Sequence, residues 1–482
     1  YKALRDRGWN VIIVNYNPET VSTDWDIVDR LYNTELTPSS LRWIALKEKT
    51  KNFIISAGGQ IGNNLALDLA KNGLKILGTS PYSIDRAEDR SKFSKIVEEL
   101  GLKQPPWRRV DNLKDALDFA TTVGYPVIVR PSYILSGSSI FIAWNKKELS
   151  SLVERVVSMS DKPIVISKFY EGAIEAEVDG VSDGSSALII PLEHVEPAGV
   201  HSGDATMHTP LREIDENTLR KMAESTHSLI KELNIMGPFN IQFIVKDSDL
   251  YVLEMNLRCS RSMPFSSKAC GINLMDLWAS IITNSKLIVP RNSIEMTNNI
   301  YVPYISTWAV KSPQFSWAQL RGAYPFLGPE MRSTGEVASL GLSFHEALLK
   351  SWTSATPNKI PNSEQTVLIY TTSSQDACIM EAAATIFRES DFEVVTLAGG
   401  VVDRLNVLCI EDAVHAIKRN TIGLIITSGY SPSIDYAVRR TAVDHNVPII
   451  LDAKLGYEIA QAIYRYKTGE IELETKELSE YW

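Results

Sequence analysis

Short apolar runs alternate with amphipathic stretches along residues 1–81. The runs Asn10–Asn15 and Asn52–Ser56 are typical of buried parallel strands. After the second run, Gly58–Gly59 leads into apolar positions at helical spacing. This alternation predicts a Rossmann-like α/β half.

The next part of the chain changes pattern twice. Residues 82–125 show helical spacing, with Phe93 and Val97 on one face and Gly101 as a stop signal. Residues 126–352 mix both periods, and one long helix is predicted over 216–233. The predicted strands of this part are Pro126–Arg130, Ile140–Ala143, Pro163–Ser167, Ala187–Pro191, Phe239–Val245 and Leu250–Glu254.

A polar stretch with two prolines, 353–365, is the clearest linker. Strand and helix patterns then alternate again, which predicts a separate small α/β domain over 366–482. The predicted domains are 1–81, 82–352 and 366–482. Residue 1 looks like an internal position, so we expect the first domain to be incomplete and the chain to be part of a longer one.

Composition narrows the function classes. The chain has 482 residues and a net charge of −9, which is unfavourable for general binding to a nucleic-acid backbone. The four cysteines lack CxxC spacing, which favours free thiols in a reducing compartment over zinc. No apolar run approaches the ~20 residues of a membrane span. We therefore expect neither nucleic acid nor membrane as a partner.

The strongest chemical signal is a predicted hairpin around the polar turn 247–249. Period 2 places Val252, Glu254 and Asn256 on one face of the second strand. A three-residue loop sets Gln242 across from Glu254, so three oxygen-bearing side chains converge. Mg²⁺ prefers such ligands when substrate phosphates complete its shell. From the hairpin alone, an exposed hairpin with a polar face remains the alternative.

Three further features could contact phosphate. Arg258 and Arg261 follow the hairpin, and guanidinium groups suit phosphate and carboxylate. A loop of small residues, Arg130–Ser139, leaves an apolar strand, and the loop Gly199–Asp204 carries His201. Solvated arginines and ordinary surface loops remain alternatives for each of them.

Taken together and in order, these motifs resemble one family. The series RPSYxLSG, SKF, GVHSGD, FNxQF, ExNxRxSRSxPFxSK and LGPEMRSTGEV is similar to the large chain of carbamoyl-phosphate synthetase. The blocks VNYNPETVSTDWDxxDRLY (14–32) and DRAEDRSKF (85–93) extend the similarity, which covers residues 2 to 350. The resemblance implies an α/β chain with a Rossmann-like pre-ATP-grasp domain, an ATP-grasp fold and a C-terminal methylglyoxal-synthase-like domain.

That family builds its large chain from two similar halves. Only the second half, which phosphorylates carbamate to carbamoyl phosphate, is followed directly by an effector domain. Residues 366–482 therefore imply the second half. The resemblance implies a product for arginine or pyrimidine biosynthesis, with the arginine-specific type as a further expectation.

The resemblance also implies roles at the nucleotide. Arg90 and Arg130 would contact ATP phosphates, Lys168 and Tyr170 would lie at the adenine, and Glu175 would lie at the ribose. The implied loop against the nucleotide consists of Gly199, Val200, His201 and Ser202.

Metal and catalytic roles are implied for the hairpin and its continuation. Gln242, Glu254 and Asn256 would hold Mg²⁺ or Mn²⁺, with Gln242 and Glu254 also at the nucleotide. Asn256, Arg258 and Arg261 would act in catalysis. Ser138 departs from the family pattern, because many bacterial relatives carry arginine there.

Cofactors and partners follow from the same resemblance. ATP, Mg²⁺ or Mn²⁺, and K⁺ are the implied cofactors. The partners would be the N-terminal half of the same large chain and a glutaminase chain or domain that supplies ammonia. A cytoplasmic location is expected, with the mitochondrial matrix as the alternative.

The terminal domain departs from the effector pattern. Family members grip an effector phosphate with a Thr-x-Gly-Thr turn and a nearby lysine, whereas this chain has Leu397–Gly400 at the turn and Arg404 without lysine in the next loop. Only Thr427–Gly429 keeps hydroxyls nearby. We therefore predict no useful inhibition by uridine monophosphate. Two alternatives to the whole interpretation are another ATP-grasp ligase, such as a biotin carboxylase-like enzyme, and a catalytically silent regulatory half.

Overall fold

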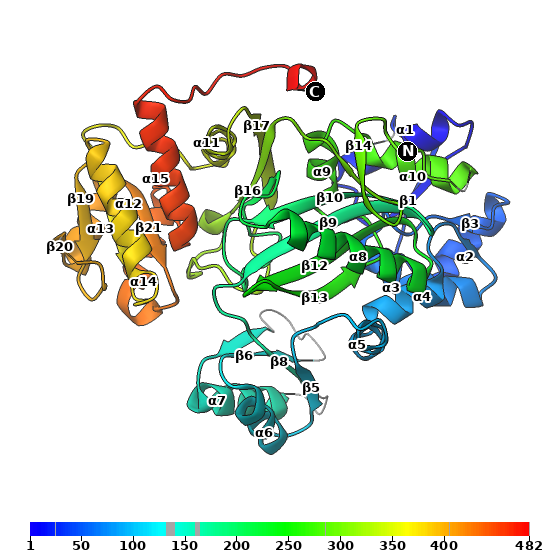
Figure 1. Cartoon of the computed structure of the whole chain (residues 1–482), viewed down its shortest axis with the longest axis horizontal. Coiled ribbons are helices and arrows are strands. Elements are labelled where there is room, and N and C mark those ends of the chain that lie inside the picture. The colour runs from blue at the N-terminus through cyan, green and yellow to red at the C-terminus, as the bar shows by residue number, and fades with distance from the viewer. Residues whose placement is uncertain (25, 132–139, 160–163, 285, 404, 482) are drawn as a thin grey trace. The chain divides into compact units, whose positions relative to one another are not determined.

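The computed structural model describes residues 1–482 apart from 25, 132–139, 160–163, 285, 404 and 482 (Figure 1). The chain divides into two compact units. The first comprises 1–104, 176–192 and 211–305, and the second comprises 105–175, 193–210 and 306–482. Each is described by itself. The domain boundaries expected from the sequence remain predictions.

The first unit opens with α/β alternation, as expected. Two parallel strand pairs form, β1 (Ile12–Asn15) with β2 (Arg30–Asn33) and β3 (Asn52–Phe53) with β4 (Lys75–Ile76). Thr37 begins one helix with a reciprocal capping box to Ser40. The helical segments here are α1 (Lys2–Arg5), η1 (Val21–Thr23), α2 (Pro38–Lys47), α3 (Gly59–Lys71), α4 (Pro81–Glu88) and α5 (Arg90–Glu99).

A sheet forms the centre of the first unit. Its strands lie in the order β13–β12–β9–β10, with β15 beside β10 and β14 beside β15. On β12, Phe239, Ile241 and Phe243 are fully buried, whereas Asn240 and Gln242 occupy the alternate positions. The alternation therefore separates an apolar face from a polar one. Strand bounds are β9 (Ile174–Asp183), β10 (Ala187–His194), β12 (Met236–Lys246), β13 (Asp249–Asn256), β14 (Ser293–Thr297) and β15 (Ile300–Pro303).

Helices cover this sheet. The predicted long helix is confirmed as α8 (Glu216–Leu233), which Asp215 caps by accepting from the Thr218 amide. It packs against β13, β14 and β15, and α10 (Leu274–Asn284) packs against β12. The short helix α9 (Met263–Ala269) follows the strand that carries Glu254.

The second unit begins with an antiparallel sheet in the order β5–β8–β6–β7. Its strand β5 (Trp107–Val110) corrects the expectation that 82–125 is helical throughout. Those residues become a strand because they pair with β8, with Trp107 opposite Ser167. The other elements are α6 (Leu113–Val123), β6 (Val127–Pro131), β7 (Phe141–Ala143), α7 (Lys146–Met159) and β8 (Ile164–Lys168).

A second antiparallel group in this unit is β11 (Met207–Thr209), β16 (Trp308–Gln314) and β17 (Gly335–Gly341). Helix α11 (Phe344–Ser354) packs against β16 and β17. The short helix η2 (Trp317–Gln319) lies in the long connection between those two strands.

The C-terminal part contains a parallel five-stranded sheet in the order β20–β19–β18–β21–β22. Helix α12 packs with α15, and α13 packs with α14. The α/β alternation expected here is present, and the more specific methylglyoxal-synthase-like assignment remains a prediction. The bounds are β18 (Thr366–Thr371), α12 (Ala377–Glu389), β19 (Val394–Leu397), β20 (Asn406–Leu408), α13 (Ile410–Lys418), β21 (Ile422–Ser428), α14 (Pro432–Asp444), β22 (Ile449–Ile450), α15 (Ala453–Lys467) and η3 (Leu478–Tyr481).

Candidate active site

The hairpin β12–β13 places Gln242 directly opposite Glu254, as predicted. The turn length and the strand register that produce this pairing differ from the prediction. The turn holds two residues, Asp247 and Ser248, both at positive φ (51° and 67°), and Lys246 pairs with Asp249. The prediction of a three-residue loop was therefore wrong. A bulge then leaves Leu253 as an extra residue and restores the expected pairing.

The same bulge corrects a second expectation. Val252 pairs with Phe243, so it lies on the apolar face and not beside Glu254. Asn256, opposite Asn240, stays on the polar face. The polar patch on β13 therefore consists of Glu254 and Asn256.

Glu254 and Asn256 are half-buried and lie within contact of each other. The Asn256 Nδ2 donates to Glu254 Oε1 at 3.2 Å, and Asn256 Oδ1 accepts from Arg258 Nη2 at 3.2 Å. Within the described ranges, no group of three or more His, Cys, Asp and Glu side chains could hold a metal ion. The predicted metal set therefore depends on one carboxylate with two amides, which fits a hard cation that shares its shell with phosphate.

Arg258 contacts a residue that sequence reasoning did not single out. Its Nε and Nη2 both donate to Gln60 Oε1, at 3.3 and 3.2 Å. Gln60 lies in the first turn of α3, within the run GGQIGNN (58–64) that follows the second predicted strand. The run thus supports an arginine of the hairpin region. Arg261, three residues further on, is exposed.

Arg90 begins α5 and reaches the bulge. Its Nη1 donates to the carbonyl oxygen of Leu253, next to Glu254. Asp89 caps the same helix by accepting from the amides of Ser91 and Lys92. The structure therefore brings together Arg90, Gln242, Glu254, Asn256 and Arg258 within the first unit.

Two buried carboxylates on β9 lie behind this patch. Glu177 accepts from Gln242 Nε2 at 3.2 Å and from Asn240 Nδ2 at 2.9 Å. Asp179 accepts from Asn240 Nδ2 at 3.0 Å, from Ser260 Oγ at 2.6 Å and from Ser266 Oγ at 2.7 Å. Asp179 therefore ties β12, the loop between Arg258 and Arg261, and α9 together.

Burial, followed by the charge of Glu177, raises the pKa of Asp179 above its ordinary value. Asp179 accepts from neutral donors, the Asn240 amide and the hydroxyls of Ser260 and Ser266. Sequence reasoning missed both carboxylates because it did not predict strand β9. The available signal was the period-2 acidic pattern of Glu175, Glu177 and Asp179.

The second unit holds the residues expected at the adenine and ribose. Lys168 ends β8, and its Nζ donates to the carbonyls of Gly124 (3.1 Å) and Tyr125 (3.0 Å). Burial lowers the pKa of this ammonium group. Tyr170 is half-buried, and Glu175 is buried near the start of β9. The Lys168 side chain therefore holds the loop 124–125, in addition to the role at the adenine that the resemblance implies.

The loop 199–204, which we name the nucleotide loop after the role expected from the resemblance, packs closely on its surroundings. Gly199 has φ 112°, and a Cβ there would meet the Phe169 ring at 2.8 Å, so only glycine fits. His201 Nδ1 accepts from the Gly203 amide at 3.0 Å, which makes Nε2 the protonated nitrogen of neutral His201. Lys311 Nζ donates to the Ser202 carbonyl at 3.2 Å.

Arg130 provides the clearest fit to an anion in the second unit. Its Nε is buried without a hydrogen-bond partner among the described residues. A buried guanidinium donor left unpaired is costly, and an incoming phosphate would satisfy it. Ser138 and most of the small-residue loop lie outside the described residues.

Two family models match the chain. Residues 1–86 match "Carbamoyl phosphate synthase preATP-grasp domain", and residues 89–289 match "Carbamoyl-phosphate synthase L chain, ATP binding domain". Carbamoyl phosphate synthase large chains from Saccharolobus islandicus and Pyrococcus furiosus are each 48% identical, over 98% and 100% of this chain. The chain spans 44% of the length of these relatives.

Solved structures show the same fold at low identity. The biotin carboxylase domain of Hydrogenobacter thermophilus 2-oxoglutarate carboxylase, in complex with MgADP, ADP and bicarbonate, has a TM-score of 0.59 at 15% identity and covers 73% of this chain and 86% of its own. N5-carboxyaminoimidazole ribonucleotide synthetase from Thermotoga maritima has a TM-score of 0.54 at 18% identity, with 73% and 93% covered. Among the described helices, none combines the length and apolar character needed to cross a membrane.

Proposed function

Because the chain belongs to the family of carbamoyl phosphate synthase large chains and carries their ATP-grasp unit, we propose that it phosphorylates carbamate. A carbamate oxygen attacks the γ-phosphorus of ATP, the bond to the β,γ-bridging oxygen breaks, and carbamoyl phosphate and ADP result. The observation that carries this proposal is the hairpin, where Glu254 and Asn256 lie beside the Arg258 guanidinium group.

The hairpin residues have distinct roles in this proposal. Gln242, Glu254 and Asn256 would hold Mg²⁺ or Mn²⁺, and the ion would neutralise charge on the phosphates. Arg258 and Arg261 present planar cations to the transferred phosphoryl group, whose charge spreads over its equatorial oxygens. Gln60 limits the rotation of Arg258, because Arg258 donates to it through two nitrogens.

The nucleotide roles rest on the family resemblance. Arg90 and Arg130 contact phosphate, Lys168 and Tyr170 contact the adenine, and Glu175 contacts the ribose. The buried Nε of Arg130, which has no hydrogen-bond partner among the described residues, supports an anion in the second unit. The close packing of Gly199 on Phe169 supports a shaped loop there.

Finer features of the proposal concern context. The parallel α/β domain over 366–482 supports the second, carbamate-phosphorylating half. Its departures from the effector pattern favour the arginine-specific type over pyrimidine biosynthesis. Partners would be the N-terminal half and a glutaminase, and K⁺ would be a further cofactor. Carbamate decays quickly in water, so an enclosed passage from the partner half should deliver it.

The test is the reverse partial reaction of the purified chain. With ADP, carbamoyl phosphate and Mg²⁺, it should form ATP, and omission of either substrate should abolish the signal. Biotin should leave ATP turnover unchanged, and stimulation by biotin would favour a biotin carboxylase-like enzyme. Nucleotide binding without any phosphoryl transfer would favour a silent regulatory half.

A further inference from the structure

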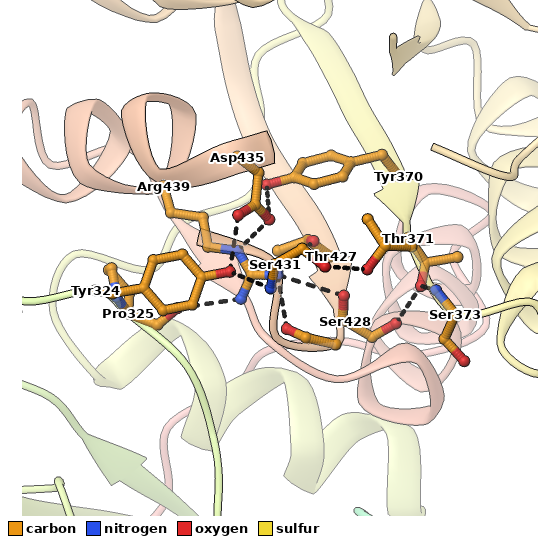
Figure 2. Close-up of polar contacts among 12 residues, drawn as sticks. Tyr324, Pro325, Tyr370, Thr371, Ser373, Thr427, Ser428, Ser431, Asp435 and Arg439 are labelled. Carbon is orange, nitrogen blue, oxygen red and sulfur yellow. Dashed lines mark hydrogen bonds and ion pairs between the residues drawn. The ribbon is translucent and has the colours of Figure 1, made fainter. Parts of the chain in front are cut away.

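Helix α14 presents two successive arginines to the connection between β16 and β17. Arg439 is almost fully buried, and its Nε donates to Asp435 Oδ2 at 2.6 Å. Its Nη2 donates to Thr427 Oγ1 at 3.1 Å and to the Gly429 carbonyl at 2.9 Å. Figure 2 shows the guanidinium group between the strand end of β21 and Pro325, whose carbonyl accepts from Nη1 at 3.1 Å.

Asp435 completes this cluster with two tyrosines. Tyr324 Oη donates to Asp435 Oδ1 at 2.7 Å, and Tyr370 Oη donates to Oδ2 at 3.1 Å (Figure 2). The Arg439 guanidinium also lies 4.9 Å from the Tyr324 ring centroid. Tyr324 is thereby held from both its ring face and its hydroxyl.

Arg440 holds the same connection at three more points. Its Nη1 donates to the carbonyls of Trp317 (3.2 Å), Leu320 (2.9 Å) and Ala323 (3.2 Å). Its Nε donates to Asp444 at 3.0 Å, which orients the group. We call residues 317–325 the clamped segment, because these two arginines bind carbonyl groups along its length.

The clamped segment continues directly into residues that hold the nucleotide loop. Asp204 accepts from the amides of Arg332 (2.9 Å) and Ser333 (2.8 Å). The Gly328 carbonyl accepts from the His201 amide at 2.8 Å. A Cβ on Gly203 would lie 2.7 Å from the Met331 sulfur, so packing there is also tight.

We propose that Arg439 and Arg440 are positioning residues for the nucleotide loop, and that they act through the clamped segment and residues 328–333. These two side chains thereby raise the affinity of the loop 199–204 for the nucleotide. This inference rests on the proposed function, because it assumes that the loop 199–204 contacts the nucleotide. A role confined to stabilising the C-terminal domain would leave that loop unaffected.

The chemistry of the cluster favours a positioning role. Carbonyl groups of an irregular segment have no strand partner to hold them, and a charged fork fixes several at once. Without Arg440, the Trp317 and Leu320 carbonyls keep only their local bonds from the amides of Leu320 and Ala323, and residues 317–325 are freer to move. The movement reaches Gly328–Ser333 along the covalent chain.

The test compares Arg440→Gln with the matched control Arg465→Gln, which removes a half-exposed arginine whose ion pair is with Glu470. Tyr436→Phe is a milder second variant, because it removes only the hydroxyl that donates to the Gly322 carbonyl at 3.0 Å. Calorimetry measures ATP binding to the whole chain, and hydrogen exchange follows the amides of His201, Arg332 and Ser333.

We expect Arg440→Gln to weaken ATP binding about fivefold or more, with a smaller change in Tyr436→Phe and none in Arg465→Gln. The three amides should exchange faster in the same order. By reciprocity, ATP should slow exchange in 317–325 of the wild-type chain, which requires no variant.

Faster exchange confined to 317–325, with ATP affinity within twofold of wild type, would overturn the inference. If Arg440→Gln does not fold, the inference is tested by Tyr436→Phe and by the effect of ATP on hydrogen exchange in 317–325 of the wild-type chain. If the wild-type chain binds no ATP, the proposed function is refuted, and so is the predicted effect of Arg440→Gln on ATP affinity. Exchange of the Arg332 and Ser333 amides would then still show whether the clamp reaches the nucleotide loop.

Discussion

Two buried aspartates in this protein are surrounded in opposite ways. Asp435 in the second unit accepts from the cation of Arg439 and from two tyrosine hydroxyls. Asp179 in the first unit accepts from the neutral donors of Asn240, Ser260 and Ser266, with the carboxylate of Glu177 also bonded to Asn240. Both side chains are fully buried.

The difference in hydrogen-bond donors indicates a different role for each cluster. An ion pair with complete hydrogen bonding is a satisfied arrangement, and it suits the fixing of a segment. Asp179 is buried beside the like charge of Glu177 and accepts from neutral amide and hydroxyl donors, which is a costly arrangement, and such costs gather at functional sites. We infer that Asp179 is retained because it holds the loop of Arg258 and Arg261.

The largest expected effect is on the hairpin itself. Glu254→Ala should lower ATP formation from ADP and carbamoyl phosphate about a thousandfold, because the metal loses its carboxylate and the transition state loses charge neutralisation. Steady-state assays with Mg²⁺ measure it. Glu224→Ala, an exposed carboxylate on α8, is the control. A folded Glu254→Ala chain with normal activity would remove the metal assignment.

The second prediction tests Asp435, the aspartate that is paired with the Arg439 cation. Asp435→Asn should destabilise the C-terminal sheet by about 3–5 kcal/mol, because Arg439 would keep a buried charge without its anion. Exchange of β18 and β21 amides in increasing urea measures it. Asp444→Asn, whose ion pair with Arg440 is half exposed, should cost less than about 1 kcal/mol. Equal losses in both variants would contradict the assignment.

The third effect concerns the arginine fork. Arg258→Lys keeps the charge but cannot make two bonds to Gln60 from a planar group. Phosphoryl transfer should fall about a hundredfold, with a much smaller change in nucleotide affinity. Single-turnover rates and calorimetry separate the two quantities. Arg220→Lys, on the exposed face of α8, is the control. A change in affinity alone would make Arg258 a binding residue.

The fourth effect has the opposite sign from that of Asp435→Asn. The raised pKa of Asp179 means that the folded chain holds its proton more tightly, so this group lowers stability as pH rises above about 4. Asp179→Asn removes that dependence. It should stabilise the first unit by about 1 kcal/mol at pH 8 and less at pH 5, while kcat falls about tenfold.

Thermal unfolding at the two pH values checks the fourth prediction. Asp249→Asn is the control, because the hydrogen bond from Lys103 lowers the pKa of Asp249 and gives a pH dependence of opposite sign. If Asp179→Asn destabilises the chain at both pH values, the Asp179 carboxylate stabilises the fold, as the Asp435 carboxylate does.

The smallest expected effect is the absence of a response to uridine monophosphate. Thr427 accepts from Arg439, and Ser428 Oγ bonds to Thr371 Oγ1 at 2.7 Å and donates to Asp376 at 2.6 Å. These hydroxyls are already engaged, and the Asp376 carboxylate would repel phosphate. Arg404, the remaining candidate, lies outside the described residues. Calorimetry with the whole chain should show no binding, and micromolar affinity would contradict the prediction.

Much of the α/β organisation could be predicted from local pattern. The long helix 216–233 and the strands β18, β19, β21 and β22 have a clear period or a short apolar run, and burial on one or both faces imposes that pattern directly. Strand β5 could not be predicted in this way, because its Arg108 and Arg109 are exposed and its pairing with β8 is distant in sequence.

The hairpin shows the same limit at the site. The sequence alone led to the pair Gln242 and Glu254, but through a turn of the wrong length and without the bulge at Leu253. Turn length and bulge cancel in the pairing, so the correct residues emerged while Val252 was assigned to the wrong face.

The amino-acid sequence by itself determined the periodic elements, the family and the residue types available for metal and phosphate. Only the tertiary structure decided that Glu177 and Asp179 lie behind the hairpin, that Gln60 supports Arg258, and that the α14 arginines bind 317–325. The reason is the separation along the sequence between the residues in contact. Periodicity reports each residue's own burial, whereas these contacts join segments tens to hundreds of residues apart, which no local pattern encodes.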